Sequence, residues 1–277
     1  MKTRIISGAV GVALLALLLW LRATVVFNIA LALIGALMVF ELFRAEKLHK
    51  EYAMLIVSML YVAVGAFLPR LIDPLIRYLG SAQPYIGAAF AYIVICQTIL
   101  LTRHKHVELG RVFTAEAYTL LIALCITSLS SFGFDEDDGL LLIVLTCMGA
   151  WVADTGAYFA GTFFGKHKLC PDISPKKTVE GLIGGAVANA VVFALVPVVL
   201  KLEMPLLTSV LFAVMGVICC FLGLLGDLTA SLIKRDAGIK DFGNIMPGHG
   251  GALDRFDSVI YIAPYVFFMM SKSLVIS

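Results

Sequence analysis

Charged side chains are scarce in this chain. Asp, Glu, Lys and Arg make up 14% of its 277 residues, whereas 61% of the residues are hydrophobic. A soluble domain carries roughly 25% charged residues, so the composition excludes an ordinary soluble domain and argues against disorder and nucleic-acid binding. At about 20 residues per crossing, the chain can hold about eight to ten membrane spans and almost no extramembrane domain.

Cys and His residues at the spacings typical of metal sites are also missing from the sequence. None of the six cysteines forms a CxxC pair, and most of them lie inside apolar runs, where cysteine acts as a small packing residue. No spacing of His and Cys suits zinc either. Any metal site is therefore expected to use oxygen ligands.

Long apolar runs fill most of the chain and predict an all-α, polytopic integral membrane protein. Nine transmembrane helices are expected near residues 5–21, 24–43, 53–69, 84–102, 115–133, 139–161, 180–200, 205–232 and 257–275. The first run lacks a convincing cleavage site, so we predict a retained helix rather than a signal peptide. The eighth run would be about 42 Å long as a helix. It should therefore tilt, bend near Gly223 and Gly226, or project into the cytosol.

Positive charge is distributed unevenly along the chain. A cytosolic N-terminus places sixteen Lys and Arg residues on the inner side and five on the outer side. Because cytoplasmic loops are enriched in these residues, we predict this orientation, in the inner (cytoplasmic) membrane. Residues 1–150 are expected to form about five helices and the start of the sixth. Residues 151–277 carry the motifs, whose loops, 162–179 and 233–256, then face the cytosol, where nucleotides are found.

The first motif-bearing segment runs from Ser231 to Asp257 between two apolar runs. Asp227 lies four residues before the start of this segment, and Lys234 lies inside it. Asp227, Ser231 and Lys234 are spaced at i, i+4 and i+7, so they share one face of a helix. An acid in an apolar helix is costly and needs a partner, such as a cation. Carboxylates suit Mg²⁺, so Asp227 and Asp254 are the candidate metal ligands. Asp257 fits a helix cap equally well.

A glycine-rich turn lies in the same segment and contains Pro247, Gly248, Gly250 and Gly251. Glycines let backbone N–H groups approach an anion closely, so the turn suggests a phosphate-binding loop at the membrane surface. Three roles stay open for His249: a turn residue, a phosphate donor, or a general acid–base.

The second motif-bearing segment covers residues 151–181. Asp154, Tyr158, Gly161 and Gly165 fall at i, i+4, i+7 and i+11, a face that lets another helix or a ligand approach closely. Four lysines follow, and membrane topology alone could account for them: Lys166, Lys168, Lys176 and Lys177.

The run Ser174-Pro175-Lys176-Lys177 predicts a helix start, with Ser174 as N-cap and Pro175 in the first helical position. Helix N-termini favour phosphate, whereas lysines in a first turn oppose the helix dipole. An anionic ligand therefore explains the two lysines better than helix stability does. Glu41 and Glu116 lie near predicted helix ends and are assigned no role.

The two segments together carry a specific pattern. The C-terminal one reads Ser231-x-Ile233-Lys234-Arg235, Lys240-Asp241-x-Gly243, Pro247-x-His249-Gly250-Gly251 and Asp254-Arg255-x-Asp257. The upstream one contains Asp154, Ala157-Tyr158, Gly161, Phe164-Gly165-Lys166, Ser174-Pro175-Lys176-Lys177-Thr178 and Glu180-Gly181. The pattern resembles the phosphatidate cytidylyltransferase (CDP-diacylglycerol synthase) family. The likeness is concentrated in residues 151–258, whereas residues 1–150 agree only as a hydrophobic, helical half.

This resemblance implies an enzyme that condenses phosphatidic acid with CTP to CDP-diacylglycerol and diphosphate. It also implies dependence on Mg²⁺, with room for a second cation, and a homodimer in the membrane lipid. On this hypothesis Asp227 and Asp254 hold the metal. The phosphate oxygens are neutralised by Lys234, Arg235 and Lys240 and cradled by the backbone of residues 248–251.

The remaining candidate residues have less definite roles. Lys176 and Lys177 bind either the triphosphate or the lipid phosphate, and Asp154 holds a second metal or a lysine. The other catalytic candidates are Asp241 and His249, and the other substrate-binding candidates are Lys166, Ser174, Ser231, Gly248, Gly250, Gly251 and Arg255.

Two other functions are alternatives to this one. A CDP-alcohol phosphotransferase would need an acidic helix of the DxxDGxxAR type, which the sequence lacks. A membrane transporter of a lipid or anionic solute is the main alternative. Transporters usually place broken helices and charges near the membrane midplane, whereas here the charges gather near one predicted surface.

Overall fold

The computed structural model describes residues 11, 13–79, 83–134, 138–202, 205–245 and 250–270. The chain forms two compact units. The first unit comprises Met1–Leu140 and Asp236–Phe256, and the second comprises Leu141–Arg235 and Asp257–Ser277. The division predicted after residue 150 stays a prediction.

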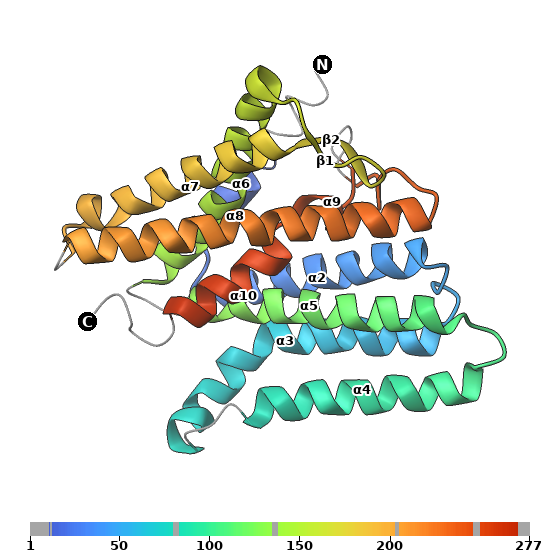
Figure 1. The fold of residues 1–277 in the computed structure, drawn as a ribbon. Coiled ribbons are helices and arrows are strands. Elements are labelled where there is room, and N and C mark those ends of the chain that lie inside the picture. Colours follow the sequence, from blue (N-terminus) through green and yellow to red (C-terminus); the bar gives the residue numbers. More distant parts are fainter. Residues whose placement is uncertain are drawn as a thin grey trace. The chain divides into compact units, whose positions relative to one another are not determined.

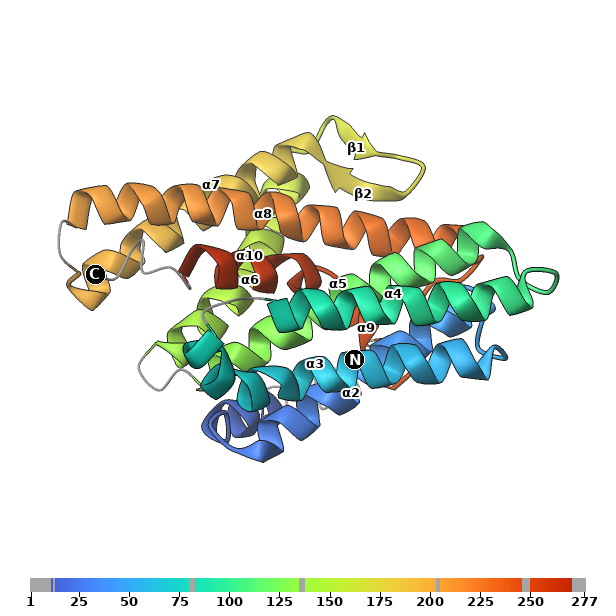
Figure 2. The same ribbon diagram turned by 90° about the horizontal axis from the view of Figure 1, so that it is seen from below.

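The first unit is a bundle of long helices. Residues 13–20 are helical, and they are followed by α2 (Val25–Ala45), α3 (Tyr52–Leu79), α4 (Gln83–Arg103), α5 (Leu109–Phe134) and the short α9 (Leu253–Phe256). Helices α2, α3 and α5 pack on one another, and α4 lies along α3 and α5 (Figure 2). Fully buried apolar side chains such as Met38, Leu42, Val62 and Ile126 form the core of this bundle.

The second unit contains the remaining helices and a small hairpin. Its elements are α6 (Gly139–Phe164), β1 (Lys168–Cys170), β2 (Ser174–Thr178), α7 (Val179–Leu200), α8 (Pro205–Asp236) and α10 (Val259–Met270). The two strands pair antiparallel between α6 and α7 (Figure 1). Glycines let α6 and α7 approach closely: a Cβ on Gly156 would lie 2.7 Å from the Cβ of Ala188, and one on Gly185 would lie 2.7 Å from the Ala153 carbonyl oxygen. On the face predicted from the sequence, a Cβ on Gly161 would lie 3.6 Å from the Cα of Gly181 in α7, so another helix does approach closely at that position.

Seven helices within the described residues are long and apolar enough to cross a membrane: α2 to α8. This agrees with a helical, polytopic membrane protein. The count of nine and the cytosolic N-terminus stay predictions. Of the first predicted helix, residues 11 and 13–20 are described as helical, and residues 1–10 and 12 lie outside the described part. The last helix, α10, has 12 residues and ends at Met270, beyond which the chain is not described.

Helix α8 has 32 residues, which corresponds to a length of about 48 Å. Figure 1 shows it as one uninterrupted ribbon, so Gly223 and Gly226 do not break it. These glycines instead make room for the last element of the unit. A Cβ on Gly226 would collide with the backbone of Asp257, and one on Gly223 would lie 3.2 Å from Ile262.

The predicted helix start at Ser174 is wrong. Residues 174–178 form strand β2, and α7 begins five residues later, at Val179. The N-cap is Thr178, which has extended φ and ψ of −127° and 155° and accepts a hydrogen bond from the Gly181 N–H. The Ser-Pro pattern is compatible with an extended chain as well as with a helix start, and pairing with β1 decides between the two. The two lysines therefore do not lie in the first turn, and the helix-dipole argument for an anionic ligand falls away.

Candidate active site

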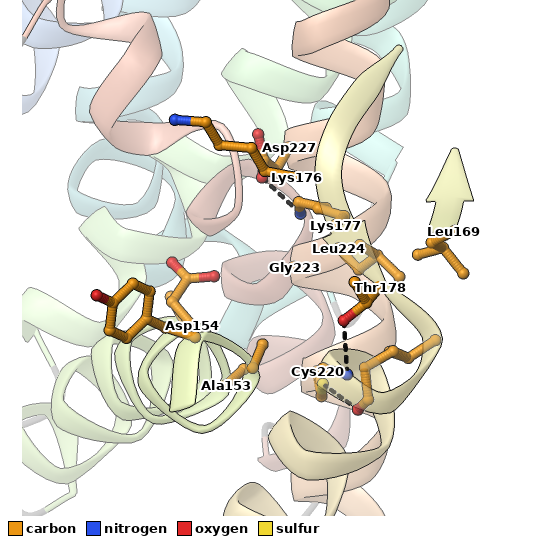
Figure 3. A pocket seen from close by; sticks show the side chains of 15 residues that line it. Ala153, Asp154, Leu169, Lys176, Lys177, Thr178, Cys220, Gly223, Leu224 and Asp227 are labelled. Carbon is orange, nitrogen blue, oxygen red and sulfur yellow. Dashed lines mark hydrogen bonds and ion pairs between the residues drawn. The ribbon is translucent and has the colours of Figure 1, made fainter. Parts of the chain in front are cut away.

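A cavity of about 320 Å³ lies within the second unit, where α6, β2, α7 and α8 meet. Asp154 and Tyr158 reach it from α6, Lys176 and Lys177 from β2, and Asp227 from α8 (Figure 3). Its size is at the lower end of the range for small-molecule sites. The structure thus brings four of the predicted site residues, two acids and two lysines, to one hollow.

The central contact of this cavity is an ion pair between a strand and a helix. The Lys177 Nζ lies 2.5 Å from the Asp227 Oδ2, and both side chains are only partly exposed, at 23% and 31%. The Ser231 hydroxyl donates to the other carboxylate oxygen of Asp227 at 3.4 Å. The shared helix face that the sequence predicts for Asp227 and Ser231 is therefore confirmed.

The hairpin fixes the direction of Lys177. Lys176, the preceding residue, also lines the cavity but is exposed, whereas Lys177 is only partly exposed. The strand ends at Thr178, which is buried and caps α7. Directly before the start of β2, the carbonyl oxygen of Ile173 accepts a hydrogen bond from the Arg235 Nε at 3.4 Å. The hairpin is thus tied to the end of α8.

Asp257 adds another carboxylate to the surroundings of Asp227. Its Oδ1 accepts a hydrogen bond from the Ser258 N–H at 2.8 Å. Burial, together with repulsion from Asp227 and Asp154, raises the pKa of Asp257 to about 7 despite the opposing charge of Lys234. Carboxylates that repel one another in this way would be stabilised by a cation between them.

Magnesium fits this arrangement only in combination with substrate. Within the described ranges, no three Asp, Glu, His or Cys side chains form a group that could hold a metal ion by themselves. Mg²⁺ commonly uses one or two carboxylates and completes its shell with water and phosphate oxygens. Asp227 and Asp257 satisfy that requirement by their chemistry and by their mutual repulsion. The dependence on Mg²⁺ stays a prediction.

The segment that contains the glycine-rich turn belongs to the first unit. Its described parts, called here the glycine-rich loop, are residues 242–245 and 250–253. The Asp254 Oδ2 accepts hydrogen bonds from the N–H groups of Phe242, at 2.8 Å, and Gly251, at 3.0 Å. Gly250 has a φ of +87°, a left-handed conformation that favours glycine. Asp254 therefore shapes the loop that leads to it. Because Asp227 and Asp254 lie in different units, their sharing of one metal stays a prediction.

Other predicted site residues lie on the same elements. Lys234 and Ser231 are half-buried on α8, Ser174 begins β2, and Lys166 is exposed before β1. In the first unit, Lys240, Asp241 and Arg255 are exposed. Gly248 and His249 lie outside the described residues.

Sequence reasoning missed Glu41, which is 2% exposed on α2. Its carboxylate accepts hydrogen bonds from the N–H groups of Ala252 at 3.1 Å and Leu253 at 2.8 Å. An acid inside an apolar run is a signal that could have found it, but its partners are more than 200 residues away in the sequence.

Comparison with known proteins gives two kinds of match. The model of the Cytidylyltransferase family matches residues 2–273. A phosphatidate cytidylyltransferase of Bacillus subtilis is 33% identical over 286 residues, which cover 98% of each chain. One from Staphylococcus aureus is 34% identical over 194 residues, covering 69% of this chain and 74% of its own. One from Staphylococcus haemolyticus is 41% identical over 150 residues, covering 51% of this chain and 56% of its own.

Proposed function

The chain belongs to the cytidylyltransferase family, and we propose that the cavity around Lys177 and Asp227 is where it joins CTP to phosphatidic acid. It is a nucleotidyltransferase of phospholipid biosynthesis, and its products are CDP-diacylglycerol and diphosphate. One observation supports the placement of the site above all others. The Lys177–Asp227 pair sets a cation beside a carboxylate inside the cavity of the second unit. The matches lend no support to a transporter.

The lipid phosphate acts as the nucleophile in this reaction. One of its oxygens forms a bond to the α-phosphorus of CTP, and the bond from that phosphorus to the bridging oxygen of the β-phosphate breaks. Diphosphate leaves with the electron pair. Because a phosphate monoester is ionised at neutral pH, no strong general base is needed, and catalysis depends on positioning and charge neutralisation.

The lysines of β2 divide the phosphates between them. Lys177, beside Asp227, neutralises the triphosphate. Lys176 lines the same cavity and is the more exposed of the two, which suits the lipid phosphate. Lys234 and Arg235 add positive charge at the last turn of α8, and Arg235 contacts the hairpin at Ile173. Mg²⁺ bound by Asp227 with Asp257 or Asp254 would neutralise phosphate oxygens as charge develops on the leaving diphosphate.

The site is proposed to open to the cytosolic face of the inner membrane. Positive charge along the chain favours that orientation, and CTP is a cytosolic nucleotide. Acyl chains need no dedicated pocket if the site also opens sideways into the bilayer. A homodimer belongs to the same proposal.

Diphosphate release that depends on both CTP and phosphatidic acid tests this function directly. Asp227→Asn and Lys177→Gln each remove one partner of the ion pair, so turnover should fall by about 10²-fold or more. Asp254→Asn tests whether the first unit contributes to the same reaction, and a comparable loss is expected.

Asp172→Asn provides a matched control, because Asp172 is an exposed acid on the same hairpin. This variant should retain wild-type turnover. A wild-type protein that releases no diphosphate with both substrates would overturn the function. Near-normal turnover in Asp227→Asn at limiting Mg²⁺ would instead overturn the site.

A further inference from the structure

The β1–β2 hairpin projects from the start of α7 (Figure 2), and an acid in the first turn of that helix closes its base. Both carboxylate oxygens of Glu180 accept a hydrogen bond from the His167 backbone N–H, each at 3.2 Å. The His167 Nδ1 lies 2.6 Å from Glu180 Oε1, and it is the donor because an ionised carboxylate can only accept hydrogen bonds. The Val179 N–H donates to the His167 carbonyl oxygen at 2.9 Å. These contacts, called here the clasp, join the residue before β1 to the two residues after β2.

The regular pairing of the two strands is interrupted where the lysines lie. At the base of the hairpin, Lys168 is paired with Thr178. Further along, Cys170 is paired with Ser174, and the register shifts between these two pairs. One residue of β1 therefore spans the same interval as three residues of β2, which are Pro175, Lys176 and Lys177. Because extra residues at such an irregularity are left unpaired, the strand ladder alone specifies the lysine positions only weakly.

Contacts at the two ends of β2 specify those positions instead. The residue before the strand, Ile173, is held by the Arg235 side chain. The strand ends at Thr178, which is buried, and the clasp follows directly. Lys177 is the neighbour of Thr178, so a displacement of the chain at the clasp would move the Lys177 backbone and with it the ion pair to Asp227.

We propose that Glu180 is a positioning residue, which holds the base of the hairpin so that Lys177 lies beside Asp227. This inference rests on the proposed function, because that function assigns Lys177 to the triphosphate. Among the described residues, those lining the cavity include Thr178 and Gly181 but not Glu180. Glu180 therefore acts through the chain that it holds, and its loss should weaken catalysis by misplacing the lysine.

Glu180→Gln keeps the shape of the side chain but leaves only one acceptor oxygen, and it turns an N–H₂ group toward the His167 donors. We expect turnover to fall by about tenfold, because small displacements of a charge-neutralising group are costly. His167→Ala removes the ring donor and keeps the backbone contacts, so its loss should be smaller. Asp172→Asn is the matched control. Asp172 is an exposed acid in the turn of the same hairpin, and this variant should keep wild-type turnover.

A double-mutant cycle tests whether Glu180 acts through Lys177. In Lys177→Gln the side chain that the clasp positions is already lost, so adding Glu180→Gln should lower turnover by less than about twofold more. A residue that merely stabilised the fold would cause the same loss in both backgrounds. His167→Ala should show the same non-additivity with Lys177→Gln, which keeps the test decisive if Glu180→Gln does not fold.

Hydrogen exchange provides a readout that is independent of turnover. In Glu180→Gln, the amides of residues 167 and 179 should exchange faster than in the wild type, because the clasp includes both as donors. Amides in the middle of α7 should stay protected. Asp172→Asn should leave the exchange of residues 167 and 179 unchanged.

The outcomes separate this inference from the proposed function. A wild-type protein without CTP-dependent diphosphate release defeats the function, although faster exchange at residues 167 and 179 in Glu180→Gln would still support the clasp. An active wild type with equal losses from Glu180→Gln in the wild-type and Lys177→Gln backgrounds would overturn the positioning role. Unchanged exchange at residues 167 and 179 in Glu180→Gln would overturn it as well.

Discussion

Asp257 illustrates how neighbouring charges set the state of a single carboxyl group. It is partly buried, Asp227 and Asp154 repel its charge, and Lys234 attracts it. With a pKa near 7, the neutral and ionised forms are both populated near neutral pH. Only the ionised form is a metal ligand, so a proton and a cation compete for the same group.

In the absence of metal, the free energy of unfolding should therefore fall as pH rises. Asp257 ionises above its ordinary pKa of 3.8 in the unfolded chain, but it holds its proton up to about pH 7 in the folded protein. The unfolded state thus binds fewer protons across that window, and rising pH favours it. Thermal unfolding in EDTA from about pH 5 to about pH 8 measures the slope, which Asp257→Asn should flatten.

Two comparisons make this measurement specific. Asp172→Asn, an exposed acid, should keep the wild-type slope. Adding Mg²⁺ near the upper end of the range should raise the Tm of the wild type more than that of Asp257→Asn, because bound ligand stabilises the folded state. Equal pH slopes in the wild type and Asp257→Asn would contradict the role assigned to this carboxyl.

Sequence periodicity predicted local relationships between residues well, but not distant ones. The spacing of Asp227 and Ser231 placed them on one helix face, and their hydrogen bond confirms it. Glu41 received no role, because its partner Leu253 is 212 residues away and no local pattern links them. Tertiary contacts decide the conformation of the chain at Ala252 and Leu253. They therefore also decide which groups hydrogen-bond to the buried Glu41 carboxylate.

At the scale of elements, the hairpin shows where a local signal gave the wrong structure. Ser174-Pro175 fits the start of a helix, yet β1 pairs with this segment, with Cys170 opposite Ser174 and Lys168 opposite Thr178. The functional consequence is large. In the strand, Lys177 pairs with Asp227, whereas Lys176 is the more exposed of the two lysines that line the cavity.

The contact between α6 and α7 supports the cavity, because both helices line it. A Cβ on Gly184 of α7 would collide with the Cβ of Ala160 on α6 and lie 3.2 Å from the Gly156 carbonyl oxygen. Gly184→Ala should therefore destabilise the protein by about 1–3 kcal/mol, measured by unfolding in detergent. It should also lower turnover, because α6 carries Asp154.

Gly87→Ala is the control for this packing prediction. A Cβ at Gly87, on α4, would meet nothing within 4 Å, so the substitution should be neutral or slightly stabilising, as expected for alanine in a helix. Equal stability of Gly184→Ala and Gly87→Ala would show that α6 and α7 are not closely packed at this point.

At the scale of the whole molecule, composition sufficed to predict a helical, polytopic membrane protein, and seven candidate spans in the described residues agree with it. The return of one segment to the first unit was not foreseen. Residues 237–256 follow α8 in the sequence but belong to the first unit. The segment returns there because α2 provides Glu41 and Arg44 as partners for its backbone, and a hydropathy pattern carries no information about such bonds.

The orientation of the second unit leads to a prediction about its two ends. The hairpin and the α7–α8 connection lie at opposite ends of α7, a candidate span of 22 residues. If the site faces the cytosol, Asp172→Cys in the hairpin should be protected from a membrane-impermeant thiol reagent in intact cells and react only after lysis. Lys201→Cys, at an exposed position in the connection, should react in intact cells.

The native cysteines set the background for this experiment. Four of the six are buried, and Cys147 and Cys170 are partly exposed. Cys170 lies on the hairpin itself, so Cys170→Ser is combined with each variant. The opposite pattern, with Asp172→Cys labelled in intact cells and Lys201→Cys only after lysis, would place Lys177 and Asp227 on the outer side. CTP would then have no access to the cavity, and the proposed site could not perform the reaction even if the fold were unchanged.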